Sequence, residues 1–168
     1  VKGIQMGKTL NLPIHWNMAT AKPIIGASKE MGILVNGLRG SLKQSDFEWY
    51  TGGLSKPISF VVDLLKPQQI KRVTVGCITN YGMAVHKPRM IKIEVSDDNK
   101  TFKEVGRLTF TDNETFKEGN FIEDLSVETD DIIGHYVKFT LETPGNCPND
   151  HVRPGQASRV YIDEVIIE

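Results

Sequence analysis

Glu164 is the residue whose surroundings most clearly call for chemistry. It stands in segment 160–167, where both faces of a predicted strand are largely apolar, and a carboxylate buried there is costly unless a cation accompanies it. Far upstream, segment 33–41 (ILVNGLRGS) combines two glycines with an asparagine and a serine, which permits a tight turn with inward carbonyls. Carbonyl, amide, hydroxyl and carboxylate oxygens together suit Ca²⁺. Two interpretations stay open: a Ca²⁺ site, or a plain turn with Glu164 paired to Arg39 or Arg159.

Signatures of catalysis are scarce. The sequence contains no G-x-S-x-G, no H-E-x-x-H, no glycine-rich phosphate loop and no C-x-x-C motif. Asp97 and Asp98 are adjacent carboxylates, but they lie in a predicted hairpin turn, where aspartate supplies turn hydrogen bonds. The four histidines show no metal-ligand spacing. We therefore expect a chain that is not itself an enzyme.

The composition excludes some classes of binding partner. The 168 residues are 39% hydrophobic, enough for one core. Lys and Arg number 20 against 21 Asp and Glu, so the chain lacks the basic field of a nucleic-acid binder. No apolar run approaches the roughly 20 residues that span a bilayer, and we expect no membrane insertion. The chain starts at Val1 with no visible signal peptide, and we expect it to be a piece of a longer protein. Cys77 is predicted to be a buried small hydrophobe, and a disulfide with Cys147 stays open.

Apolar residues recur with a period of two, which predicts strands. The pattern indicates strands over 58–65, 70–79, 89–96, 101–110, 121–128, 135–142 and 159–167. No helix longer than about two turns is predicted, and residues 28–35 are the best short candidate. The predicted fold class is therefore an all-β antiparallel sandwich over residues 27–168. Residues 1–26 are expected to be an N-terminal extension or linker that could add a strand. Three long loops, 36–56, 79–89 and 143–158, are expected to carry the function.

Five features occur in an order typical of one family. They are NGLRGS at 36–41, Trp49, FVVDL at 60–64, VSDDNKTF at 95–102 and IDEV at 162–165. Over residues 30–168 the chain resembles discoidin domains, also called coagulation factor V/VIII type C domains. This galactose-binding-like group includes the family 32 carbohydrate-binding modules. More narrowly, the chain resembles C-terminal modules of Bacteroidetes-type exo-glycosidases, particularly β-N-acetylhexosaminidases.

The resemblance implies a jelly roll of about eight strands and a structural Ca²⁺ beside the ligand loops. Asn36 stands where the family usually has Asp, which predicts weaker Ca²⁺ binding or a vacant site. The implied ligands are the carbonyls of Ile33, Leu38 and Asp163, the side chains of Asn36 and Glu164, and Ser41 through its hydroxyl or carbonyl.

The resemblance also implies a shallow sugar site on the loops. A sugar needs an aromatic ring for its C–H face and polar side chains for its hydroxyls. Asp150 and Arg159 stand where the family often has aromatic residues, so an acidic glycan bound through arginines is an alternative. Trp49 is expected in the core, and Tyr81 is the preferred stacking platform. The predicted ligand-binding residues are Asp46, Tyr81, His86, Arg89, His151 and Arg153.

The expected function is that of a non-catalytic module that keeps a parent glycosidase on its glycan. The family implies an extracytoplasmic setting, whether periplasmic, cell-surface or secreted. The alternative is a structural or protein-interaction module that packs on a catalytic glycosidase domain and binds no sugar.

Overall fold

The computed structural model describes residues 14–16, 34, 38–46, 49–51 and 57–168. The predicted helix over 28–35 therefore lies, apart from Leu34, outside the described residues, as do the predicted metal ligands Ile33 and Asn36. The described strands are β1 (Ile14–Trp16), β2 (Tyr50–Thr51), β3 (Ile58–Asn80), β4 (Met90–Ser96), β5 (Lys103–Thr109), β6 (Asn120–Glu142) and β7 (Tyr161–Ile167).

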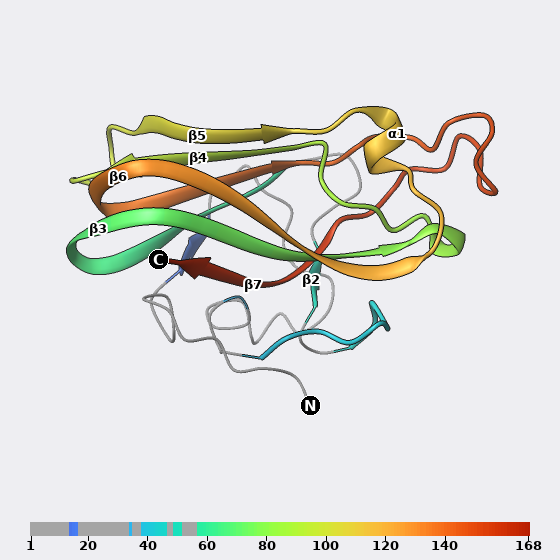
Figure 1. The fold of residues 1–168 in the computed structure, drawn as a ribbon, viewed down its shortest axis with the longest axis horizontal. Helices are drawn as coiled ribbons and strands as arrows, with labels where there is room; N and C mark the ends of the chain where they lie inside the picture. Colours follow the sequence, from blue (N-terminus) through green and yellow to red (C-terminus); the bar gives the residue numbers. More distant parts are fainter. Residues whose placement is uncertain (1–13, 17–33, 35–37, 47–48, 52–56) are drawn as a thin grey trace.

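Two long antiparallel strands, β3 and β6, organise the molecule (Figure 1). The first half of β3 pairs with the second half of β6, and β1, β4 and β5 extend this layer. The second half of β3 pairs with the first half of β6, and β7 and β2 extend the other layer. All of these pairings are antiparallel, which confirms the predicted β-sandwich.

The core lies between the layers, as the alternating pattern predicts. Phe60 and Phe139 are fully buried neighbours whose rings stack with centroids 4.9 Å apart. Val75, Val127 and other apolar residues of the second layer belong to the same core cluster. Burial of such large side chains is the main force that holds the two layers together.

Four predicted strands are in fact two. Segments 58–65 and 70–79 form the single strand β3, and segments 121–128 and 135–142 form β6. Lys66-Pro67, a pair that favours a turn, lies between the two predicted strands, and β3 accommodates it by a register shift between Asp63 and Gln68. Leu65 takes a left-handed backbone with φ of 70° there, and its N–H donates to Asp63 Oδ1 at 2.7 Å. A proline placed at an irregularity bends a strand without ending it.

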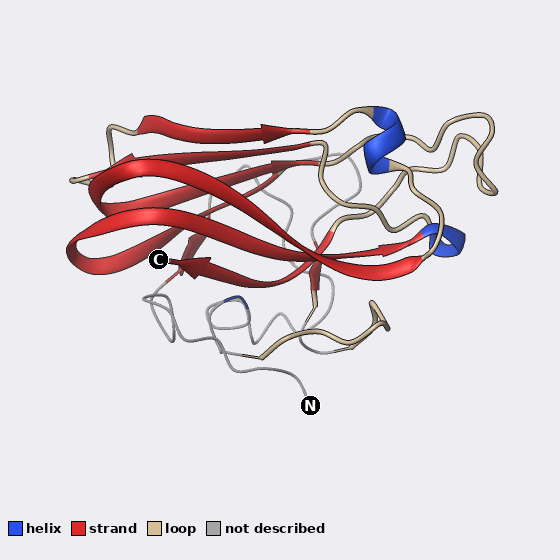
Figure 2. Cartoon of the chain, viewed as in Figure 1, coloured by secondary structure: helices blue, strands red, loops and turns tan. Residues whose placement is uncertain are grey.

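The long connections gather at one end of the sandwich, opposite the β4–β5 hairpin (Figure 2). They carry the 3₁₀ helix η3 (Tyr81–Met83) and the helix α1 (Asp112–Thr115). Thr111 caps α1, because its side chain accepts from Glu114 N–H while the Glu114 carboxylate accepts from Thr111 N–H.

Cys77 and Cys147 are both buried, and both are free thiols. The interpretation of Cys77 as a small core residue is confirmed, and the two cysteines do not pair. Among the described residues, we find no helix with the length and apolar character required to cross a membrane.

Candidate functional site

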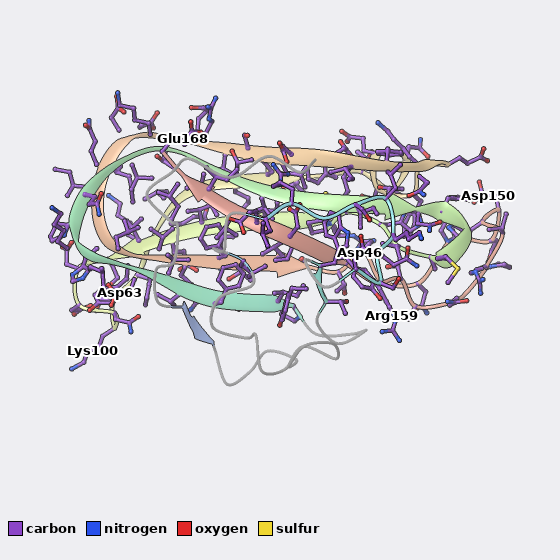
Figure 3. The ribbon with its side chains drawn as sticks, turned by 90° about the horizontal axis from the view of Figure 1, so that it is seen from below. Asp46, Asp63, Lys100, Asp150, Arg159 and Glu168 are labelled. Atoms are coloured by element: carbon purple, nitrogen blue, oxygen red, sulfur yellow. The ribbon has the colours of Figure 1, made fainter. Side chains whose placement is uncertain are left out.

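A pocket of about 350 Å³ opens at the loop end of the sandwich. Three connections meet there: η3, the segment around α1, and the loop between β6 and β7. Figure 3 shows Asp150, which lies on this loop, at the opposite end of the molecule from Lys100. The pocket is lined by Tyr81, Asp112, Asn113, Phe116, Glu118, Pro148, Asp150 and His151.

Short backbone hydrogen bonds hold these connections in place. Asn80 and Val85 bond to each other through both N–H groups, at 2.8 and 3.1 Å, and so close the turn that carries Tyr81. Within the β6–β7 loop, Cys147 N–H donates to Gln156 at 2.8 Å and His151 N–H donates to Pro148 at 3.0 Å. The loop is thus internally bonded, which preorganises the pocket.

Aromatic rings form one wall of the pocket. The rings of Tyr81 and His151 lie 4.0 Å apart between centroids, and Phe116 lies 6.3 Å from His151. His86 lies beneath them, with no exposed surface, 5.0 Å from the Phe116 ring. The rings of Tyr81 and Phe116 are half-buried and offer a surface that can stack on planar or C–H-rich ligands, whereas His151 is only 4% exposed and packs against the Tyr81 ring.

His151 and His86 are joined by a hydrogen bond of 3.0 Å between their Nε2 atoms. The backbone N–H of Arg153 donates to His151 Nδ1 at 2.9 Å. A backbone N–H can only donate, so neutral His151 carries its proton on Nε2 and donates it to His86. This leaves His86 with its proton on Nδ1, and both tautomers are determined.

Both histidines favour the neutral state. Burial, together with the neighbouring His151, lowers the pKa of His86 to about 4. Burial also lowers the pKa of His151, although the Asp150 carboxylate acts in the opposite direction. The aromatic wall is therefore uncharged near neutral pH.

The same histidines form, with Cys147, a group of three buried side chains whose donor atoms lie within 4.8 Å of one another. Nitrogen and sulfur donors of this kind suit Zn²⁺. A metal-bound histidine normally donates its other ring N–H. Here His151 Nδ1 accepts from Arg153, so a metal on Nε2 would require this loop to rearrange. The described geometry is that of a hydrogen-bonded histidine pair.

The rim of the pocket is acidic. Asp112, Glu118 and Asp150 contribute carboxylates, and Asn113 contributes an amide. Arg89 Nη2 lies 3.2 Å from Asp112 Oδ1, and the side chains of both residues are substantially exposed. Such a group of acceptors beside aromatic rings can hydrogen-bond a polar ligand that stacks on the wall.

The predicted ligand-binding residues fall into three groups. Tyr81 and His151 line the pocket, and His86 supports it from beneath. The side chains of Arg89 and Arg153 hold loops, since Arg89 donates to the Pro144 carbonyl at 2.8 Å and Arg153 donates to the Gly82 carbonyl. Outside the pocket lining, Asp46 accepts a hydrogen bond from the Ser41 hydroxyl.

Most of the segment around α1 carries no strand pattern that would mark it as part of the site. The capping pattern from Thr111 to Glu114 was a signal for a short helix, and that helix places its flanking side chains at the pocket. Nothing in strand periodicity could link this segment to the β6–β7 loop. The lining residues that were not predicted to bind a ligand are Asp112, Asn113, Phe116, Glu118, Pro148 and Asp150.

The second candidate region surrounds the start of β7. Asp163 and Glu164 are both fully buried. Asp163 Oδ2 accepts from Arg39 Nε at 2.9 Å and from Gly40 N–H at 2.8 Å. Burial raises the pKa of Asp163, and the Arg39 charge opposes that rise. Asp124, rather than Glu164, is the second carboxylate bonded to Arg39.

Close backbone approach makes this arrangement possible. A Cβ on Gly40 would overlap the Trp49 ring, and one on Gly76 would overlap the Asp163 carboxylate. Trp49 is buried, as predicted for a core residue, and its Nε1 donates to the Ser41 carbonyl at 2.9 Å.

Among the predicted metal ligands that the structure describes, Leu38 is exposed and Ser41 is half-buried. Leu38, Ser41, Asp163 and Glu164 offer only oxygen donors, including the enclosed carboxylate of Glu164. This donor chemistry fits a hard cation such as Ca²⁺.

No protein-family model matches the sequence, and no curated protein matches it. Solved structures do match its fold. The module CpGH89CBM32-5 from Clostridium perfringens, in complex with GalNAc-β-1,3-galactose, superposes with a TM-score of 0.56 at 12% identity, over 92% of this chain and 94% of that one.

Two further structures match over nearly their whole length. The C-terminal domain of a chitobiase from Bacteroides fragilis has a TM-score of 0.55 at 14% identity, over 96% of this chain and 95% of that one. Chitosan-binding module 1 of a chitosanase/glucanase from a Paenibacillus species has a TM-score of 0.56 at 18% identity, over 98% and 99%. The chain therefore has the β-sandwich fold of the family 32 carbohydrate-binding modules.

Proposed function

We propose that this chain is a non-catalytic carbohydrate-binding module that holds a glycan residue in the pocket at its loop end. The observation that carries this proposal is that the half-buried rings of Tyr81 and Phe116, packed around the buried His151, line the same pocket as a rim of hydrogen-bonding side chains. The wall would stack on the C–H face of a sugar, and the rim would accept from its hydroxyls. The affinity of one such shallow site is expected to be modest, with a Kd on the order of 0.1–1 mM.

The parent protein is proposed to be a glycoside hydrolase. The chitobiase domain and the chitosan-binding module are each part of a larger carbohydrate-active protein. Tethering to a catalytic domain in cis would make a weak site useful by raising the local concentration of substrate. A glycan ligand supports an extracytoplasmic location.

We also propose a structural Ca²⁺ near the start of β7. Glu164 would supply the carboxylate, Leu38 and Asp163 would supply carbonyls, and Ser41 would supply its hydroxyl or its carbonyl, with Ile33 and Asn36 completing the set. The fully buried Glu164 supports this assignment, since an enclosed carboxylate is stabilised by a cation. The ion would tie the 33–41 segment to β7.

Titration of the chain with a panel of oligosaccharides tests the binding function. Galactose, N-acetylgalactosamine, N-acetylglucosamine, glucosamine and uronic-acid glycans should all be included. We expect Tyr81→Ala to weaken the binding of any ligand found by at least about tenfold, because a stacked sugar loses about 1.4 kcal/mol or more with its platform.

Tyr136→Ala is the matched control. Tyr136 is half-buried on β6 and stacks on His135, and it pairs with Ser96 in the ladder, at the end of β4 away from the pocket. Its loss should leave sugar binding unchanged. If the folded chain binds no sugar of the panel, the result would instead support a structural module that packs on a catalytic domain.

A further inference from the structure

We propose that His86, Cys147 and His151 bind a Zn²⁺ ion beneath the loop-end pocket, at a site separate from the sugar pocket and from the proposed Ca²⁺ site. The three side chains are 0%, 3% and 4% exposed, and their donor atoms all lie within 4.8 Å of one another. His86 lies between β3 and β4, whereas Cys147 and His151 lie in the β6–β7 loop. The site goes beyond the proposed function and does not depend on it.

The donor set is the first argument for this ion. Zn²⁺ binds imidazole nitrogen at about 2.0–2.1 Å and thiolate sulfur at about 2.3 Å, which in a tetrahedral site separates the donor atoms by about 3.3–3.6 Å. The Nε2 atoms of His86 and His151 are 3.0 Å apart. A shift of roughly 1 Å by Cys147 would therefore complete the ligand geometry. The group contains no carboxylate, so it is not an acidic cluster of the surface.

Two of the three donors are available without a change of partner. Cys147 is a buried free thiol that does not pair with Cys77. The Nε2 of His86 directs its lone pair toward His151, and its ring proton is on Nδ1. This is the tautomer that a histidine has when it binds a metal through Nε2.

His151 must exchange its hydrogen bonds when the ion binds. Its Nε2–H donates to His86, and its Nδ1 accepts from Arg153 N–H at 2.9 Å. Zn²⁺ takes the place of the proton between the two rings, and that proton moves through water to Nδ1, so His151 stays neutral. The Cys147 thiol releases its proton to solvent as the Zn–S bond forms. Arg153 N–H then turns to water, because Arg153 is exposed.

The surroundings of His151 permit this exchange. His151 lines the pocket, so an ion can reach its ring from solvent. The Asp150 carboxylate is close enough to raise the pKa of His151. A carboxylate is also the kind of acceptor to which metal-bound histidines donate their second ring N–H. Three protein ligands leave the fourth zinc position to water.

The test uses the full chain after treatment with a chelator that is then removed by dialysis. Zn²⁺ is titrated in competition with a chromophoric chelator, and we expect one ion per chain with a Kd at or below about 1 μM. Co²⁺ is then added in place of Zn²⁺. A thiolate ligand should give a charge-transfer band in the near ultraviolet, which a site made only of nitrogen and oxygen donors does not give.

Cysteine variants identify the sulfur donor. Cys147→Ser should weaken Zn²⁺ binding by at least about a hundredfold and remove the Co²⁺ band, because loss of an outer-shell partner alone costs about 10- to 100-fold. Cys77→Ser is the matched control, since Cys77 is also a buried free thiol but lies on β3 in the core. It should keep both the affinity and the band.

Further variants identify the nitrogen donors and separate the two metal sites. His86→Gln should weaken Zn²⁺ binding as strongly as Cys147→Ser, whereas His135→Gln should not, because His135 does not belong to the group. Glu164→Gln should also leave Zn²⁺ binding unchanged, since the proposed Ca²⁺ site uses oxygen donors. Circular dichroism in chelator checks that each variant is folded.

Three results would overturn the Zn²⁺ site. They are an absence of Zn²⁺ binding by the folded chain, Co²⁺ binding without the charge-transfer band, and Zn²⁺ binding that survives both Cys147→Ser and His86→Gln. Sugar titration of the metal-free chain tests the proposed function separately. Sugar binding without Zn²⁺ binding would refute only the metal site, and Zn²⁺ binding without sugar binding would refute only the sugar-binding function.

Discussion

His86 and His151 share a hydrogen bond of 3.0 Å between their Nε2 atoms, and the Arg153 backbone N–H sets its direction by occupying His151 Nδ1. His86 is 65 residues from His151 in the chain, and it has no exposed surface. The bond therefore couples the connection after β3 to the β6–β7 loop directly beneath the pocket. The orientation of the His151 ring, and with it part of the aromatic wall, depends on a residue that no sugar in the pocket reaches.

Replacement of His86 should damage both stability and binding. In His86→Leu the Nε2–H of His151 loses its buried acceptor, which is expected to cost about 1–3 kcal/mol in the free energy of unfolding. Urea denaturation measures this loss, and sugar affinity should fall as the His151 ring reorients. His135→Leu is the control, because the His135 side chain is 22% exposed and lies beside Asp63 in the second half of β6 rather than under the pocket. A larger loss in this control than in His86→Leu would contradict the prediction.

Acid should destabilise the chain through the same residue. The pKa of His86 is lowered to about 4 from an ordinary value of 6.5. Between these two pH values His86 is protonated in the unfolded chain but not in the folded chain. The free energy of unfolding therefore falls as the pH decreases from about 6.5 toward 4, and His86 does not affect it above pH 6.5. The contribution is at most about 3 kcal/mol.

The pH effect of His86 is isolated by difference. Urea unfolding at pH 7 and pH 4.5 should show a smaller loss of stability in His86→Leu than in the parent chain, because carboxylates elsewhere titrate in both. Equal losses in the two proteins would show that His86 does not drive the acid sensitivity.

Arg39 is expected to be far more important to stability than other arginines in ion pairs. Its Nε lies 2.9 Å from the fully buried Asp163. Arg39→Met would leave this buried carboxylate without its cationic partner, which is expected to lower the free energy of unfolding by about 3 kcal/mol. Arg72→Met removes a pair of similar length with Glu168, at 2.8 Å, whose side chains are nearly half-exposed. That control should lose about 1 kcal/mol or less, and similar losses in both variants, by urea denaturation, would refute the distinction.

Calcium should stabilise the chain if the proposed site near Glu164 forms. At a concentration about a hundredfold above its Kd, the ion would add about 2.7 kcal/mol, or roughly 5–10 °C in Tm for a domain of this size. Glu164→Gln should remove most of this shift, and Asp97→Asn should keep it. A Tm that is the same in Ca²⁺ and in chelator would exclude the Ca²⁺ site. The proposal of a sugar-binding pocket would not be affected.

Local sequence pattern determined the strands and the fold class. Val137, Phe139 and Leu141 alternate with the polar residues Lys138 and Thr140, and this period of two places the three apolar side chains on one buried face. The same pattern could not show that β3 continues through Pro67, because only pairing with β6 decides whether a proline ends a strand or bends it.

The site divides in the same way. Tyr81 and His151 could be selected from the sequence because a stacking sugar site needs rings on loops, and both lie in loops. Phe116 and Glu118 could not be, since α1 reaches the pocket only when β5 and β6 have each paired with β4. Residue type is a local property that the sequence displays directly. The acidic character of the pocket depends on which loops meet at one end of the sandwich, and only the long-range packing of the two layers decides that.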